Sequence, residues 1–512
     1  MSGLNSLRRI NTITFNGLET LDVDLQVQIA SGLPNFIIVG LPDKAVAESK
    51  ERIRSAFHTI GVQIPAKRII INLAPADLLK EGSHFDLPIA MGILSAMGVI
   101  PQDKITDYIV LGELGLDGSI IPVNGVLPVA INAKRKNKGI ICPAAQGSEA
   151  AWSGIKSIIA PKNLLTLINH FNGSDEIPYP KAEQKESSPK FLDMRDVKGQ
   201  ETAKRALEIA AAGGHNVLMI GPPGSGKSML ACRLPGILPP LTTEEALETC
   251  MIHSIAGELK DGKLNLERPY RDPHHNASTP ALVGGGRKAQ PGEISLAHNG
   301  ILFLDELPEF NRPTLEALRQ PLENGRVTIS RVHAHTEYPA KFQLIAAMNP
   351  CRCGHLGNPE LACKRAPICA EEYQSKISGP LMDRIDIHID TPAVKPYDLA
   401  NIPTGESSDE IRARVIRARN TQQKRFQKLG EHNLQTNSQL KGDLLEKLTV
   451  LDDDSKKLLV TFAEQNHLSA RAYHRILRLA RTIADLQNEI NISKMHIAEA
   501  LSYRRILPKT RR

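Results

Sequence analysis

Short apolar runs alternate with helical patterns through the first 170 residues of the chain. Runs rich in Ile, Val and Leu at 69–73 and 107–111 have the length and composition of strands. Over 45–60 and 87–97, apolar residues recur every three or four positions, which is typical of helices. The pattern therefore predicts an α/β domain over residues 1–170.

A second α/β pattern occupies residues 191–395, after a polar stretch with Pro and Ser at 171–190 that has little to bury. Its runs at 217–220 and 301–304 are wholly apolar, as in the buried strands of a parallel sheet. Residues 396–512 show mainly helical spacing. We expect a flexible linker, a core built on a parallel sheet and a C-terminal helical lid, in that order.

Two segments interrupt the second pattern. The interval of about 253–297 is longer than one helix–strand–helix unit needs, which indicates an insertion. Over residues of about 327–341, polar and apolar side chains alternate, a turn follows, and a second extended run leads back. This pattern predicts a β-hairpin. Adjacent His274 and His275, within the insertion, point to opposite sides of an extended chain, which favours a structural or partner-contact role over metal binding.

The most specific chemical signal lies between the apolar run at 217–220 and the next helical segment. It is a phosphate-binding pattern made of Gly221, Pro222, Pro223, Gly224, Ser225, Gly226, Lys227 and Ser228. Glycines let backbone N–H groups surround phosphate oxygens, and the helix that follows adds its partial positive charge. We expect Lys227 to reach the β- and γ-phosphates and Ser228 to hold Mg²⁺. A chance glycine-rich loop is the alternative, but the strand before it and the helix after it favour binding of a nucleoside triphosphate.

Acidic and amide side chains follow two further apolar runs. Asp305 and Glu306 come directly after 301–304, and Asn349 follows the run at 340–347 by two positions. At the carboxyl ends of parallel strands these side chains would lie beside the phosphate loop. We expect Asp305 to support Mg²⁺, Glu306 to polarise the attacking water, and Asn349 to position that water.

Four of the seven cysteines fall within nineteen residues, at Cys351, Cys353, Cys363 and Cys369. Clustered thiolates suit a structural zinc site, although the two cysteines separated by one residue are an unusual spacing. Either zinc or four reduced, metal-free thiols fits this pattern. An odd total of cysteines argues against a secreted disulfide framework.

Composition narrows the class of protein only slightly. Hydrophobic residues make up 41% and charged residues 23%, and the net charge is +7. No apolar run reaches the length of a membrane span, so we expect a cytoplasmic protein without a membrane partner. Residues 411–428 carry seven basic side chains and no acid, a pattern shared by solvated helix faces and by surfaces that contact a nucleic-acid backbone.

The first domain resembles the proteolytic domain of Lon proteases, a fold related to ribosomal protein S5. The resemblance rests on residues 80–86 and on 112–127. In that family a Ser nucleophile is activated by a Lys, but His84 and Leu127 stand at the two matching positions. A Ser–Lys dyad needs both partners, so the resemblance implies a protease-like fold that has become a binding or assembly domain.

From about Val197 onward the motifs resemble AAA+ ATPases, in the branch of the magnesium-chelatase subunits and MCM helicases. The Lon-like domain, the segment 268–275 and the segment 349–354 together resemble the ComM (YifB) family over nearly the whole chain. This implies a ring, expected to be a hexamer, with active sites between protomers. Arg384 matches the arginine finger that enters the neighbouring site, and Arg471 matches the second sensor, with Arg475 as its rival. For Arg384, an ion pair with Asp383 or Asp386 is the structural alternative.

Two functions compete under this resemblance. The first is an ATP-dependent DNA helicase that drives branch migration in homologous recombination and natural transformation, with Arg331 and His333 on the hairpin near single-stranded or branched DNA. The second is a chelatase-like ATPase that remodels a protein partner. An ATP-dependent protease is a third, disfavoured by His84 and Leu127.

Overall fold

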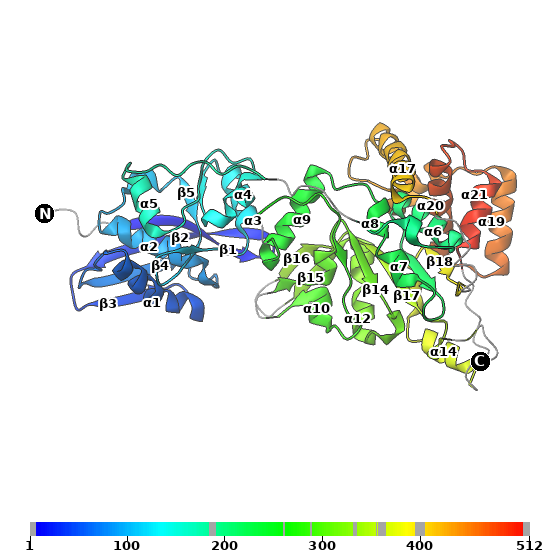
Figure 1. Ribbon diagram of the computed structural model, residues 1–512, viewed down its shortest axis with the longest axis horizontal. Helices are drawn as coiled ribbons and strands as arrows, with labels where there is room; N and C mark the ends of the chain where they lie inside the picture. The colour runs from blue at the N-terminus through cyan, green and yellow to red at the C-terminus, as the bar shows by residue number, and fades with distance from the viewer. Residues whose placement is uncertain are drawn as a thin grey trace.

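The computed structural model describes residues 7–183, 191–259, 262–286, 289–330, 335–354, 356, 365–394 and 405–504. Figure 1 shows three parts in a row: an α/β domain at one end, a second sheet in the middle, and a group of helices at the other end. None of the helices within these ranges is both long and apolar enough to cross a membrane.

The front domain is built on a seven-stranded sheet with the order β3-β4-β2-β1-β5-β8-β9. Its strands are β1 (Arg8–Asn16), β2 (Glu19–Ala30), β3 (Asn35–Val39), β4 (Arg68–Ala74), β5 (Tyr108–Val110), β8 (Gly139–Ile141) and β9 (Ile158–Ile159). The alternation along β2 buries every second side chain, as a half-covered strand requires. Helices α1 (Lys44–Thr59) and α2 (Asp86–Ala96) confirm the expected helices, and β4 and β5 confirm the expected strands.

The middle part contains a five-stranded parallel sheet with the order β11-β14-β17-β10-β18. The strands are β11 (Tyr270–Arg271), β14 (Ile301–Leu304), β17 (Gln343–Met348), β10 (Val217–Ile220) and β18 (Ile387–Asp390). Strands β10, β14 and β17 are buried along their whole length, which explains their uninterrupted apolar runs. Because the interval expected to be an insertion contains β11, part of it belongs to the sheet itself.

The expected hairpin is present beside this sheet. Strands β15 (Arg326–Ser330) and β16 (His335–Pro339) pair antiparallel, and Val327 and Tyr338 face the core. Arg331 and His333, which we expected near DNA, lie outside the described residues.

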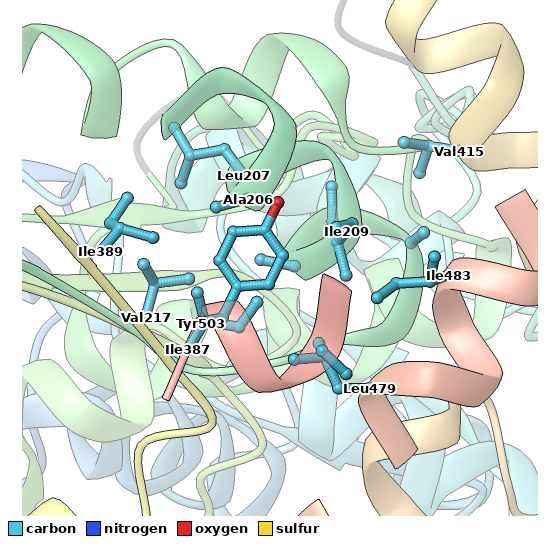
Figure 2. Packing of buried hydrophobic residues seen from close by; sticks show 14 of the residues in the cluster. Ala206, Leu207, Ile209, Val217, Ile387, Ile389, Val415, Leu479, Ile483 and Tyr503 are labelled. Carbon is cyan, nitrogen blue, oxygen red and sulfur yellow. The ribbon is translucent and has the colours of Figure 1, made fainter. Parts of the chain in front are cut away.

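The helices after β18 share one core with the sheet rather than forming a separate unit. They are α17 (Ser408–Lys428), α18 (Gly442–Leu448), α19 (Asp453–Gln465), α20 (Ala470–Leu486) and α21 (Lys494–Ser502). Figure 2 shows Val415, Leu479 and Ile483 of α17 and α20 packed near Ile209 of α6 (Glu201–Gly213). Within the part with helical spacing, α18 and α19 are separate helices, because residues 449–452 leave the helical path between them.

The front domain docks on helix α9 (Thr243–Ala256) through α3 (Val126–Arg135) and α4 (Gly147–Ala151). Leu127 packs there with Ala246 and Cys250 of α9. Beside this apolar contact, the hydroxyl of Ser254 donates to the buried carboxylate of Glu149 at 2.5 Å. Apolar packing together with a satisfied buried carboxylate fixes one orientation of the front domain.

Candidate nucleotide-binding site

The phosphate-binding loop has the conformation that its sequence predicts. It leaves β10, turns through Gly224 and Gly226, and enters α7 (Lys227–Ala231). Both glycines have left-handed backbones, with φ of 74° and 91°, which other residues adopt only with strain. The loop therefore presents the N-terminus of α7 and its N–H groups to any bound phosphate.

The ammonium group of Lys227 is held inside this loop. Its Nζ donates to the carbonyl oxygens of Gly221 at 2.8 Å and Pro222 at 2.9 Å, and to Oδ1 of Asn349 at 3.2 Å. Burial lowers the pKa of Lys227, while the charges of Asp305 and Glu306 oppose that shift. The hydrogen bonds thus hold the ammonium group next to the loop, where it could pair with phosphate oxygens in place of these contacts.

Asp305 and Ser228 meet at the carboxyl edge of the sheet. The hydroxyl of Ser228 donates to Oδ2 of Asp305 at 2.7 Å, although 77 positions separate the two residues. Two oxygen donors this close could hold Mg²⁺, which prefers carboxylate, hydroxyl and phosphate oxygens. The strand order explains the meeting, because β10 and β14 both flank β17 and all three end at one edge.

Glu306 follows Asp305 and turns away from it. Its backbone is left-handed, with φ of 51°, an uncommon conformation for a residue other than glycine. Its side chain is 49% exposed, and Oε2 lies 3.3 Å from Nδ1 of His275. The carboxylate could therefore reach a water beside the γ-phosphate while His275 limits its position.

The contact between His275 and Glu306 was not predicted from the sequence. Strand β11 delivers His275, and two arginines anchor that strand: Arg268 pairs with Glu245 of α9 at 3.0 Å, and Arg271 pairs with Glu293 at 2.6 Å. The many charged residues of the segment 268–275 were the only sequence feature that could have indicated a functional role. The partner of His275 could not be inferred, because the pairing of β11 with β14 is a tertiary contact.

Arg384 and Arg471 lie at the opposite end of the sheet from the phosphate loop. They line one cavity of about 680 Å³, together with Asn216, Gly300 and Phe342, which precede the central strands. They are therefore brought close to each other and kept away from the loop of their own chain.

The surroundings of these arginines differ from the alternatives drawn from the sequence. Arg384 pairs with Glu323 of α13 (Arg319–Asn324), and its Nε is buried without a hydrogen-bond partner among the described residues. Asp386 instead pairs with Arg475 at 2.7 Å. Arg475 is thus engaged within the chain, whereas Arg471 is exposed at the cavity.

The thiols of Cys351, Cys353 and Cys369 form a cluster near the phosphate-binding loop, because the turn that carries the first two contacts Pro223. Their sulfur atoms all lie within 4.8 Å of one another, and those of Cys351 and Cys353 are 3.1 Å apart. The first two follow β17, and the third is on α14 (Ile368–Gln374). Cys363 lies outside the described residues.

The two positions that the Lon resemblance marks are both used for packing. His84 is 6% exposed, stacks near Phe85, and its Nε2 lies 3.0 Å from the carbonyl oxygen of Ile13. Leu127 is 1% exposed, in the contact with α9. Neither side chain offers a nucleophile or a base at the surface.

Comparisons with known proteins agree along most of the chain. Three family models match: "Subunit ChlI of Mg-chelatase" over residues 25–146, "Magnesium chelatase, subunit ChlI" over 193–399, and "Magnesium chelatase, subunit ChlI C-terminal" over 405–504.

Individual relatives extend over nearly the full length. The chain is 44% identical over 502 residues to YifB of Salmonella typhimurium, covering 98% of this chain and 97% of that protein. It is 43% identical over 498 residues to competence protein ComM of Haemophilus influenzae, covering 95% of each. A magnesium-chelatase 67 kDa subunit of Heliobacterium mobile is 27% identical over 199 residues, or 33% of this chain and 29% of that protein.

Proposed function

Since the chain belongs to the ComM and YifB family of Mg-chelatase-like AAA+ proteins, we propose that it is an ATP-dependent DNA motor. In this proposal it forms a hexameric ring and acts as a helicase that promotes branch migration in homologous recombination and natural transformation. The name of the Haemophilus relative, a competence protein, supports the link to transformation.

The observation that carries the ATPase part is the convergence of Lys227, Ser228, Asp305 and Asn349 at one edge of the sheet. We assign ATP to the loop, Mg²⁺ to Ser228 and Asp305, and the activation of water to Glu306, with Asn349 positioning that water. Bound Mg²⁺ would neutralise charge on the β- and γ-phosphates. The protein groups do the rest: Lys227 pairs with phosphate oxygens, and Glu306 accepts a proton from water.

The ring is supported by the placement of the arginines. Arg384 and Arg471 share a cavity at the amino ends of the strands, so their own phosphate loop is out of reach. We assign Arg384 as the arginine finger and Arg471 as the second sensor, each acting on the site of the next protomer. A closed ring supplies every site with such a neighbour.

A second candidate is a chelatase-like ATPase that remodels a protein partner. The magnesium-chelatase family models and the Heliobacterium relative favour it. The basic stretch at 411–428 does not choose between the two, because several of its arginines are engaged inside the chain. Arg414 pairs with Glu208, Arg425 pairs with Asp485, and Arg419 donates to the carbonyl oxygen of Ala211.

ATP hydrolysis with and without forked or four-way DNA distinguishes the two candidates. A DNA motor should bind such DNA at low salt and hydrolyse ATP faster in its presence, and it should move the branch point of a labelled four-way junction. If no DNA binds or stimulates hydrolysis, the helicase assignment is wrong and the remodelling ATPase is favoured. The Glu306→Gln variant serves as the matched control, since it should bind DNA and ATP without moving the junction.

We also propose that the thiol cluster holds a structural zinc ion. In a tetrahedral site with Zn–S bonds of about 2.3 Å, sulfur atoms lie about 3.8 Å apart. The three described thiols lie within 4.8 Å of one another, which fits one such ion after small side-chain rotations. Apolar contacts of Cys351 and Cys369 with Ala370 shield the cluster. By sequence, Cys363 is the remaining thiol for a fourth ligand.

A further inference from the structure

The turn that carries two of the clustered thiols packs directly on the phosphate-binding loop. Gly354 closes this turn, and its N–H donates to the carbonyl oxygen of Cys351 at 3.0 Å. A Cβ atom added at Gly354 would lie 2.5 Å from Cδ of Pro223, so the backbone of the turn lies directly against the pyrrolidine ring of Pro223. Pro223 sits in the middle of the loop that surrounds the phosphates. A movement of the turn toward Pro223 would therefore push on the phosphate-binding loop.

The same turn is connected to Lys227 by a second route. Asn349, two residues before Cys351, accepts a hydrogen bond from Lys227 at 3.2 Å. Pro350, between them, accepts a hydrogen bond from Nε2 of Gln374 at 2.7 Å. The short stretch from Asn349 to Gly354 thus contacts the phosphate loop at both of its ends.

Helix α14 closes the arrangement on its other side. It contributes Cys369 to the thiol cluster and Gln374 to the contact with Pro350. It also carries Tyr373, whose phenol is buried and faces the negative charges of Glu309, Glu306 and Asp305; burial and these charges raise its pKa. The turn that contacts the loop and the helix that borders the acidic pair thus both contribute thiols to one cluster.

We propose that a metal ion held by Cys351, Cys353 and Cys369 braces the phosphate-binding loop, so that metal occupancy sets the affinity for ATP. This inference rests on the proposed zinc site and on the proposed ATP site. A metal bond joins the turn after β17 to α14 and removes freedom that the segment would otherwise lose when ATP binds. The ion does not touch the nucleotide and acts through Gly354 and Pro223.

Metal removal is the first test. The full-length protein, purified in reductant, should contain about one zinc per chain by mass spectrometry of the metal. A zinc-selective chelator that leaves Mg²⁺ in place should weaken binding of a fluorescent ATP analogue about tenfold. Added Zn²⁺ should restore the affinity. Unchanged affinity after proven loss of zinc overturns the brace and leaves the zinc site standing.

A glycine substitution tests the contact without touching the thiols. In Gly354→Ala the new methyl group meets Pro223, and we expect retained zinc with ATP affinity weakened about tenfold. Gly430→Ala is the matched control, because φ is +82° at Gly354 and +77° at Gly430, but no atom lies within 4 Å of the added Cβ at Gly430. Its zinc content and ATP affinity should stay those of the wild type.

The outcomes separate this inference from the proposals beneath it. If Gly354→Ala binds ATP as the wild type does, the brace is wrong. If the wild type contains no zinc, both the metal site and the brace fail, while the ATPase proposal stands. If the wild type binds zinc but no ATP analogue, the proposed function itself fails, and the brace fails with it.

Discussion

A mixture of two inactive variants tests whether each active site is divided between protomers. Lys227→Ala removes the ammonium group at the phosphate loop, and Arg384→Ala removes the guanidinium in the cavity. The loop follows the carboxyl end of β10, whereas Asn216, at the amino end, donates to the carbonyl oxygen of Arg384 at 3.1 Å. A strand of four residues spans about 13 Å, farther than the roughly 7 Å of an extended arginine side chain. One chain therefore cannot supply both groups to the same phosphate.

The expected magnitude follows from counting interfaces. In a homogeneous ring of either variant every interface lacks one group, and loss of an arginine at the γ-phosphate costs about 10³- to 10⁵-fold in rate. In an equal mixture that assembles at random, about a quarter of the interfaces join an intact Lys227 to an intact Arg384. If the interfaces hydrolyse ATP independently, the mixture should regain about a quarter of the wild-type rate.

Steady-state phosphate release, after the subunits have been allowed to exchange, is the assay. The control replaces one partner with the double variant Lys227→Ala/Arg384→Ala, which can complete no interface and should restore nothing. Native mass spectrometry verifies that mixed rings have formed. If mixed rings are as inactive as their parents, or if Arg384→Ala alone retains the wild-type rate, the divided site is refuted.

Three further predictions address other parts of the molecule. Glu306→Gln should keep ATP affinity but lower hydrolysis by about 10²- to 10⁴-fold in single-turnover assays, since only the general base is lost; a normal rate would exclude Glu306 as the base. Asp386→Asn should lower stability by about 3–5 kcal/mol at pH 7, because Arg475 loses its buried partner. Arg475 and His215 hold the pKa of Asp386 well below its usual range despite burial. This stability is therefore fully present above the unfolded pKa, about 4, and is lost as pH falls from there toward the folded pKa. Urea unfolding from pH 7 to pH 2 should show a steeper decline for the wild type than for the variant. Leu127→Ala should lower the unfolding free energy of the docked front domain by about 2–5 kcal/mol in calorimetry, while ATP affinity stays unchanged. A drop in that affinity would show that the contact of Leu127 with α9 is coupled to the nucleotide-binding site.

Local patterns predicted most of the elements. The strand, loop and helix around Lys227 form a continuous segment, so neighbouring residues carry the whole pattern that predicts them, and the same holds for α1, α2 and β4. The helical spacing over 396–512 does not mark the break between α18 and α19, because the apolar spacing continues across residues 449–452.

Side-chain partners that depend on tertiary contacts could not be predicted in the same way. The ion pair of Arg384 with Glu323 needs α13 to approach the residues just before β18. The contact of His275 with Glu306 needs the pairing of β11 and β14. The shared core of sheet and lid also depends on distant packing, which a pattern of helical periodicity does not specify.

The ion pair between Asp386 and Arg475 has a mechanical consequence for the proposed sensor. Arg471 lies on α20 about one helical turn, or roughly 6 Å, before Arg475. The ion pair with Asp386, at 2.7 Å, fixes Arg475 next to the start of β18. The segment of α20 from Arg475 to Arg471 is therefore short, and it is anchored at Arg475. A rotation of α20 by ten degrees about Arg475 would move the Cα of Arg471 by only about 1 Å. The height of Arg471 above the cavity is therefore set by the sheet of its own protomer, and large movements of the lid helices would be transmitted to it as small ones.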